Sequence, residues 1–102
     1  MEKKPVNPQE EIARIRMPRQ GELLARVVEM SGASRMRADC EDGKSRMIRI
    51  PGKMRRRVWT RVNDIILVIP WEIEKDTKAD LAWRYTEVQV EQLRKKGILK
   101  DM

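Results

Sequence analysis

Cationic side chains are concentrated in the middle of the sequence, and their chemistry suits a polyanionic partner. Residues 35–61 contain ten lysines and arginines against three acidic residues. Ten minus three is seven, which equals the whole formal net charge of +7. Arginine predominates, and its planar guanidinium binds phosphate with two hydrogen bonds and stacks on bases. Because so dense a basic segment repels itself, it indicates binding to a nucleic acid.

The candidate RNA-contacting residues share this segment and a side chain suited to phosphate or to a base. They are Arg35, Arg37, Lys44, Arg46, Lys53, Arg55, Arg56, Arg57, Trp59 and Arg61. Arg49 is less clear, because one side of its strand must face the core. Trp59 could stack on a base or pack in the core. The alternative for the cations is a solvated face that only aids solubility. Membrane binding is disfavoured, because no amphipathic helix with bulky apolar anchors accompanies them.

The usual parts of an enzyme are missing. Histidine is absent and Cys40 is the single cysteine, which excludes an internal disulfide, histidine bases and cysteine-cluster zinc sites. A nuclease would need a divalent ion held by carboxylates, and Asp39, Glu41 and Asp42 are too local and exposed for that. We therefore predict no catalytic residues, no metal and no cofactor. Cys40 itself should be a small buried residue.

Three predicted elements position most of the cations. Residues 35–40 alternate between apolar and charged, which is typical of a half-buried strand. Asp42-Gly43 predicts a hairpin turn. Residues 45–50 form the return strand, whose apolar residues fall out of phase and predict a bulge. Residues 53–59 predict a short helical turn, and the methionines at positions 30, 36, 47 and 54 are expected to fill the core.

The flanking sequence completes an all-β domain. Strands are predicted over 21–30, over 65–69, where both faces should be buried, and over 80–86, where Leu81, Trp83 and Tyr85 should face one way. Trp71 lies at a strand end and could serve the core or the surface. A capping box at Thr86–Gln89 and a stop at Gly97 predict a C-terminal helix. Five strands with a helix after the third form the order of an OB-fold barrel, whose second and third strands commonly bind nucleic acid.

The predicted organisation is a flexible N-terminal arm over 1–18, an OB-fold domain over 19–86, and a helix with a tail over 87–102. The chain has 102 residues, which suits one domain. No apolar run is long enough to span a bilayer, and the polar N-terminus predicts no secretory signal. We expect a cytoplasmic protein that is a monomer and has no membrane partner.

Several ordered motifs stand out along the chain. They are Cys40-Glu-Asp-Gly-Lys44, Pro51-Gly-Lys-Met-Arg-Arg-Arg-Val-Trp59, Asn63-Asp-Ile-Ile-Leu-Val-Ile-Pro-Trp71 and Lys78-Ala-Asp-Leu-Ala-Trp-Arg-Tyr85. Together they resemble archaeal translation initiation factor 1A, its eukaryotic counterpart and, more distantly, bacterial initiation factor 1. The resemblance runs from about Gly21 to Tyr85 and continues more weakly to Gly97. It implies an S1-like OB-fold that binds the decoding (aminoacyl) site of the small ribosomal subunit. It also implies that the chain stabilises initiator tRNA there, together with other initiation factors.

A second binding function stays open at this point. The same barrel could serve a general single-stranded nucleic-acid-binding protein or an RNA chaperone, which would bind oligonucleotides and ribosomal subunits with similar affinity. Competition between the two ligands separates these functions, because random single strands should not displace a factor from a structured site.

Overall fold

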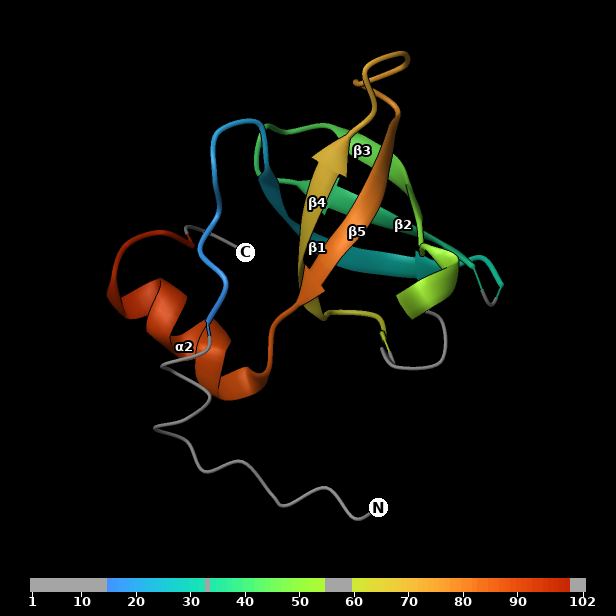
Figure 1. Ribbon diagram of the computed structural model, residues 1–102. Helices are drawn as coiled ribbons and strands as arrows, with labels where there is room; N and C mark the ends of the chain where they lie inside the picture. Colours follow the sequence, from blue (N-terminus) through green and yellow to red (C-terminus); the bar gives the residue numbers. More distant parts are fainter. Residues whose placement is uncertain (1–14, 33, 55–59, 100–102) are drawn as a thin grey trace.

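The computed structural model describes residues 15–32, 34–54 and 60–99, which form a closed five-stranded barrel followed by an α-helix (Figure 1). The elements are β1 (Leu23–Met30), β2 (Arg35–Cys40), β3 (Ser45–Arg49), the 3₁₀ turn η1 (Gly52–Met54), β4 (Ile65–Pro70), β5 (Lys78–Arg84) and α2 (Glu87–Lys95). Around the barrel the strands follow the order β1-β2-β3-β5-β4, and β3 and β5 are parallel. This is the order of an OB-fold, so the predicted fold class is confirmed.

The β2–β3 hairpin forms where the sequence predicts it. In β2, Met36, Ala38 and Cys40 are buried, and the residues between them are exposed. Gly43 has φ of 85°, a backbone conformation that glycine adopts without the strain of a side chain. The Asp-Gly turn therefore sends β3 back along β2 in antiparallel register.

The bulge predicted in β3 is wrong. β3 pairs with β2 along its whole length without a shift of register. Its inward positions are Arg46 and Ile48, so Met47 faces outward while an arginine lies inside. The apolar residues fall out of phase in the sequence because a polar residue, Arg46, takes an inward position and an apolar one, Met47, takes an outward position. A bulge instead occurs in β1, between Val27 and Glu29.

A second bulge changes the faces predicted for β5. Val68 pairs with Leu81 and Leu67 pairs with Trp83, which leaves Ala82 as an extra residue. Leu81 therefore packs in the barrel core, whereas Trp83 packs against a second cluster outside it. The alternation of these two apolar residues in the sequence did not reveal the bulge, because the register depends on the neighbouring strand.

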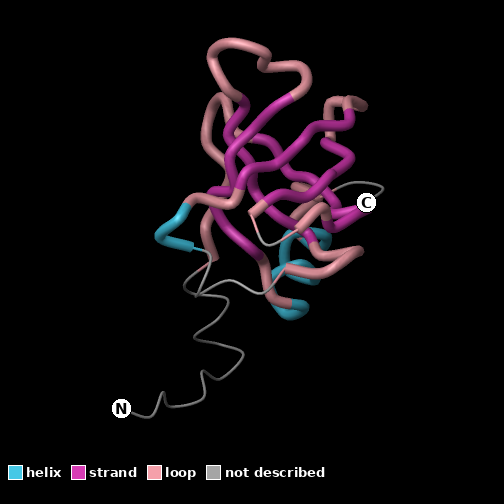
Figure 2. Tube along the Cα trace, turned by 90° about the vertical axis from the view of Figure 1, so that its right-hand side faces the viewer, coloured by secondary structure: helices cyan, strands magenta, loops and turns pink. Residues whose placement is uncertain are grey.

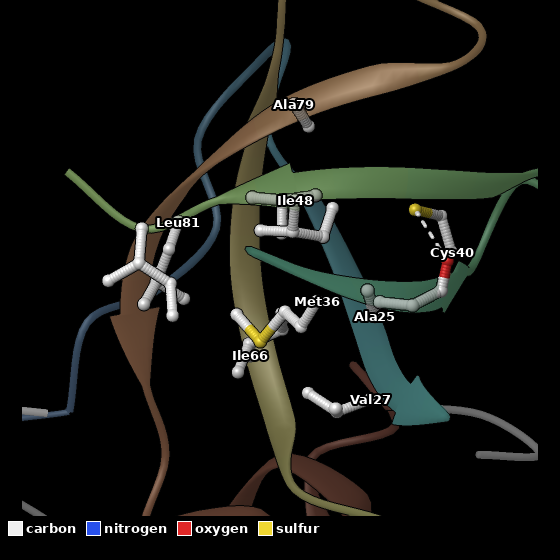
Figure 3. Packing of buried hydrophobic residues seen from close by; sticks show 11 residues of the cluster. Ala25, Val27, Met36, Cys40, Ile48, Ile66, Ala79 and Leu81 are labelled. Atoms are coloured by element: carbon white, nitrogen blue, oxygen red, sulfur yellow. Dashed lines mark hydrogen bonds between the residues drawn. The ribbon is translucent and has the colours of Figure 1, made fainter. Parts of the chain in front are cut away.

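Small and branched side chains from all five strands fill the barrel interior (Figure 3). Figure 3 labels Ala25, Val27, Met36, Cys40, Ile48, Ile66, Ala79 and Leu81 of this core. Cys40 is buried, as predicted. Two of the four methionines expected in the core are there: Met36 is fully buried, and Met54 packs against the core cluster. Met30 is exposed, and Met47 points outward from β3.

The second apolar cluster joins α2 to the barrel. Leu93 of α2 packs with Leu24, Leu67 and Tyr85 on the outside of the sheet. Burial raises the pKa of the Tyr85 hydroxyl to about 12, and that hydroxyl donates to the carbonyl oxygen of Arg16. The last residues assigned to the N-terminal arm therefore contact the barrel, whereas residues 1–14 lie outside the described part of the chain. No helix in the described ranges is long and apolar enough to cross a membrane.

The predicted capping box begins α2. The Thr86 hydroxyl accepts from the Gln89 amide nitrogen at 3.3 Å, and the Gln89 side chain accepts from the Thr86 amide nitrogen at 3.1 Å. We expect Thr86→Ala to lower the free energy of unfolding by about 1 kcal/mol, because it leaves a helix N–H without its partner. Urea denaturation measures this change. Glu87→Gln, at an exposed position in the same turn, should have a smaller effect, and equal losses would contradict the capping role.

Candidate nucleic-acid interface

The outward side chains of β2, β3 and β5 form one face of the barrel. Arg35 lies opposite Arg49, and Arg37 lies opposite Met47 across the β2–β3 pair. On the other side of β3, Met47 pairs with Lys78 of β5. We call Arg35, Arg37, Met47, Arg49 and Lys78 the outer face. Four of its five members are cationic, so the barrel closure gathers positive charge around one methionine.

The outer-face cations differ in how they are paired. Arg49 donates to both carboxylate oxygens of Asp80, at 3.0 and 2.9 Å. Lys78 lies 3.2 Å from a carboxylate oxygen of Glu74. Among the described residues, no ion pair or side-chain hydrogen bond occupies Arg35 or Arg37. These two exposed arginines are therefore available to bind an anion from solution.

The β4–β5 connection adds Trp71 beside the outer face. Its indole Nε1 donates to Asp80 Oδ1 at 2.9 Å. The Arg49 guanidinium and the Lys78 ammonium each lie 5.4 Å from the ring centroid, within cation–π range. Arg35, Met47, Arg49, Trp71 and Lys78 together line a pocket of about 240 Å³. The site thus combines cations with an aromatic ring, which is typical of surfaces that bind single-stranded RNA.

Lys44 lies at the hairpin end of the same strands. Its ammonium is 2.8 Å from an Asp76 carboxylate oxygen, and both side chains are about half exposed. The pKa of Asp76 is below its ordinary value because the Lys44 ammonium hydrogen-bonds to the carboxylate. An exposed pair of this kind is weak, so Lys44 can exchange its partner for a phosphate at little cost.

The structure corrects the predicted position of Arg46. Its side chain is only 3% exposed and faces into the barrel wall. Its guanidinium donates to both Asp42 carboxylate oxygens, at 2.9 and 2.8 Å, and to the Lys75 carbonyl oxygen at 2.6 Å. These hydrogen bonds compensate for the hydrogen bonds to water that the guanidinium loses when it is buried. Arg46 is therefore an internal brace between the hairpin and the β4–β5 connection, and it does not lie on the outer face.

The helical turn is described only at its start. Lys53 is exposed within η1, where it can contact a ligand. Arg55, Arg56, Arg57 and Trp59, predicted to contact RNA, lie outside the described residues. Their proposed contacts, and the choice between stacking and packing for Trp59, stay predictions.

Arg61 is separate from the outer face. It lines a groove of about 740 Å³ together with Asp64, Arg84 and residues of α2. Figure 1 shows residues 60–64, which lead into β4, at the end of the barrel where α2 lies, and the side view in Figure 2 places the β4–β5 connection at the opposite end. The predicted cations therefore do not all share one surface: Arg35 and Arg37 do, whereas Arg46 and Arg61 do not.

Sequence reasoning missed part of the site. Lys78 of β5 and Met47 of β3 were not among the predicted contacts, and the role of Trp71 was left open. A cluster of positive charge along the sequence identifies only those site residues that are close together in the chain. The parallel β3–β5 pairing brings Lys78 to the basic segment from outside it. One signal for this site was available. Met47 is an apolar residue on the outward side of its strand, close to two arginines.

The described residues contain no group of three or more carboxylate, cysteine or histidine ligands that could hold a metal ion. Burial raises the pKa of the Cys40 thiol, which disfavours the reactive thiolate.

Comparison with known proteins shows the family of the chain. The family model described as "Translation initiation factor 1A / IF-1" matches residues 10–102. The chain belongs to the translation initiation factor 1A family. It is 51% identical to translation initiation factor 1A of Methanococcus aeolicus, over 99% of this chain and 97% of that one. It is 47% identical to the Archaeoglobus fulgidus factor, over 90% and 96% of the two chains.

A solved bacterial protein has a similar arrangement at low sequence identity. It is the bacterial translation initiation factor 1 of the Wolbachia endosymbiont of Brugia malayi, with a TM-score of 0.49 and 19% identity over 65% of this chain and 78% of that one. Membership of the translation initiation factor 1A family rests on the family model and on the archaeal relatives.

Proposed function

We propose that this chain is a non-enzymatic initiation factor that binds the decoding (A) site of the small ribosomal subunit. Bound there, it stabilises initiator Met-tRNA binding and promotes initiation-competent subunits, together with other initiation factors. The observation that carries the proposal is the outer face, where Arg35 and Arg37 stand without ion-pair partners among the described residues, on the strands that OB-folds commonly use for RNA. Membership of the translation initiation factor 1A family supports translation initiation as the process in which this face is used.

The chemistry of the proposed site fits folded ribosomal RNA. Such RNA presents phosphates, 2′-hydroxyls and bases turned out of internal loops. Arg35 and Arg37 supply fork-shaped donors to phosphate, and the neighbouring Trp71 supplies a stacking surface. Lys53 and the predicted contacts at Arg55, Arg56 and Arg57 would continue the cationic track beyond β3. The factor would act as a cytoplasmic monomer that occupies the site through charge and shape.

Co-sedimentation with purified small subunits across a salt series tests the proposal. If about six to eight phosphates are neutralised, log K should fall against log salt with a slope of roughly −4 to −7. A slope near zero would refute the electrostatic part of the proposal. An excess of random single-stranded RNA should displace little factor from the subunit. Full displacement would instead favour the general single-strand binder.

A further inference from the structure

We propose that the groove between α2 and residues 61–65 binds an extended segment of a partner protein, in which basic and apolar residues alternate. This inference goes beyond the proposed function and does not rest on it, because the groove lies apart from the outer face. The groove measures about 740 Å³, within the roughly 300 to 1,000 Å³ of sites that enclose drug-sized ligands. In Figure 1 the end of β5 lies between its two walls, α2 and the residues that lead into β4.

Backbone hydrogen bonds hold the wall formed by residues 61–65 in place. The Asn63 amide nitrogen donates to the Val27 carbonyl oxygen at 2.7 Å, and the Val27 amide nitrogen donates to the Asp64 carbonyl oxygen at 3.0 Å. The Tyr85 amide nitrogen donates to the Ile65 carbonyl oxygen at 3.0 Å. These bonds fix the wall to β1 and to the end of β5. The groove is therefore formed before a partner arrives, and little entropy is lost in ordering it.

The charges of the groove differ from those of the outer face. Three cations and three carboxylates line it, so their formal charges cancel: Arg61, Arg84, Arg94, Asp64, Glu87 and Glu91. Arg84 and Asp64 neutralise each other through a hydrogen bond of 2.9 Å. The α2 wall presents the exposed side chains of Glu87 and Glu91. Carboxylates repel phosphates and attract lysine or arginine, so this wall favours a basic polypeptide over RNA.

The spacing of the two glutamates fits an extended chain. Glu87 and Glu91 are four residues apart in α2, which places them on one helix face about 6 Å apart along the axis. Alternate residues of an extended chain point to the same side and are about 6.5 Å apart. Among the described residues Glu87 has no ion pair, and Glu91 has only an exposed one, 3.9 Å from Lys95. Exposed pairs are weak, so both carboxylates are available to two basic residues of a partner.

The opposite wall and the floor are apolar. Val62 is 47% exposed on the wall formed by residues 61–65, while Ile65 and Tyr85 below it are buried. Val90 of α2 is half-buried in the same groove. Residues between the basic ones in an extended segment point away from α2, toward Val62. An alternating segment therefore uses both walls at once, with its cations on the glutamates and its apolar side chains on the valine.

Three synthetic pentapeptides test the groove on the full chain in solution. They are acetyl-LKLKL-amide, acetyl-LQLQL-amide, which lacks the charges, and acetyl-SKSKS-amide, which lacks the apolar side chains. Two exposed ion pairs correspond to about a 2- to 30-fold difference in affinity, so acetyl-LKLKL-amide should bind tighter than acetyl-LQLQL-amide by that factor. Its binding should shift the backbone amide resonances of Val62 and Glu91 and leave that of Arg37 on the outer face unmoved. Equal affinities for these two peptides would overturn the proposal.

Charge variants assign the preference to the α2 wall. Glu87→Gln/Glu91→Gln should bind acetyl-LKLKL-amide and acetyl-LQLQL-amide equally, with the affinity for acetyl-LQLQL-amide unchanged from wild type. The matched control is Glu72→Gln/Glu74→Gln, which makes the same change of net charge at exposed positions on the β4–β5 connection. This control should keep the preference of wild type. Equal loss of the preference in both variants would overturn the proposal, because net charge alone would then be responsible.

Val62→Ser tests the apolar wall. It should weaken the binding of acetyl-LKLKL-amide at least about threefold, because burial of the valine methyl groups is lost. Its affinity for acetyl-SKSKS-amide should not change. Ile73→Ser, at a position 80% exposed outside the groove, should bind all three peptides as wild type does. An unchanged affinity of Val62→Ser for acetyl-LKLKL-amide would contradict contact at this wall.

RNA is the competing occupant, and the same resonances distinguish it. If hexariboadenylate shifts Val62 and Glu91 while none of the peptides does, the groove binds RNA and the proposal is overturned. Failure of the proposed function gives a different result, because the peptide titration contains no ribosomes. Wild type that binds acetyl-LKLKL-amide in the groove but shows no salt-dependent binding to small subunits would refute the proposed function and support the groove.

Discussion

Replacing Arg35 and Arg37 of β2 with glutamine should weaken binding to the small subunit by roughly 25- to 60-fold at 0.1 M salt. Each phosphate contact releases about 0.7 to 0.9 of a counterion, which corresponds to a little under tenfold in affinity at that concentration. The double variant Arg35→Gln/Arg37→Gln removes two such contacts. The slope of log K against log salt should therefore become shallower by roughly 1.4 to 1.8, as measured by co-sedimentation.

Glutamine is chosen because a reversed charge would destabilise the fold, and a loss of binding could then not be assigned to the lost phosphate contacts. Arg37 lies opposite Glu29 on β1, and two carboxylates placed across a sheet repel each other. The matched control is Lys95→Gln/Lys96→Gln, which changes the net charge equally at the exposed end of α2. It should bind nearly as wild type does. Equal weakening in both variants would assign binding to net charge and remove the special role of the outer face.

The second large effect concerns stability. Asp42→Asn should lower the free energy of unfolding by about 3 kcal/mol, because it leaves the buried Arg46 guanidinium without its counter-charge. An asparagine side chain has one acceptor oxygen where the carboxylate has two, so one guanidinium donor also loses its partner. For a domain of this size the midpoint of thermal unfolding should fall by roughly 10 to 20 °C. Calorimetry measures the shift.

Asp76→Asn is the control for this effect. It makes the same chemical change in the Lys44–Asp76 pair, which is about half exposed. Exposed pairs contribute little, so the expected loss is below about 1 kcal/mol. The double variant Asp42→Asn/Arg46→Met should recover much of the stability lost in Asp42→Asn, because it removes the uncompensated charge. Similar destabilisation by Asp42→Asn and Asp76→Asn would contradict the internal brace.

The stability difference between wild type and Asp42→Asn should also depend on pH. Hydrogen bonds from Arg46 lower the pKa of Asp42 in the folded state. The folded protein therefore binds a proton at Asp42 less readily than the unfolded chain does, whose aspartates titrate near about pH 3.9. The contribution of this carboxylate is complete above that value and is lost as the pH falls through the folded-state pKa. The two unfolding curves should converge in acid.

Local signals predicted much of the architecture. Alternation in residues 35–40 predicted β2 and its buried side, and Asp42-Gly43 predicted the hairpin. The capping box at Thr86 predicted the start of α2. These features depend on residues within a few positions of one another, so propensity, turn geometry and side-chain period suffice to find them. The order of such elements then predicted the OB-fold.

The candidate site was predicted less completely, and Arg46 shows why. Its phase with Ile48 places it inside, yet the usual preference of arginine for water favoured the outer face. That preference is overcome here because Asp42 and the Lys75 carbonyl oxygen satisfy the guanidinium. Lys75 reaches Arg46 from a different part of the sequence. A buried charge therefore cannot be anticipated until its partners are known.

The sequence by itself determined a small β-barrel of one family, with its whole excess of positive charge between residues 35 and 61. Only the tertiary structure decided which cations face outward together, which one is enclosed, and which lies in a separate groove. It also brought Lys78 and Trp71 beside Met47 to form a pocket. The physical reason is barrel closure: the parallel β3–β5 pairing joins distant segments, and such contacts leave no periodic signal along the chain.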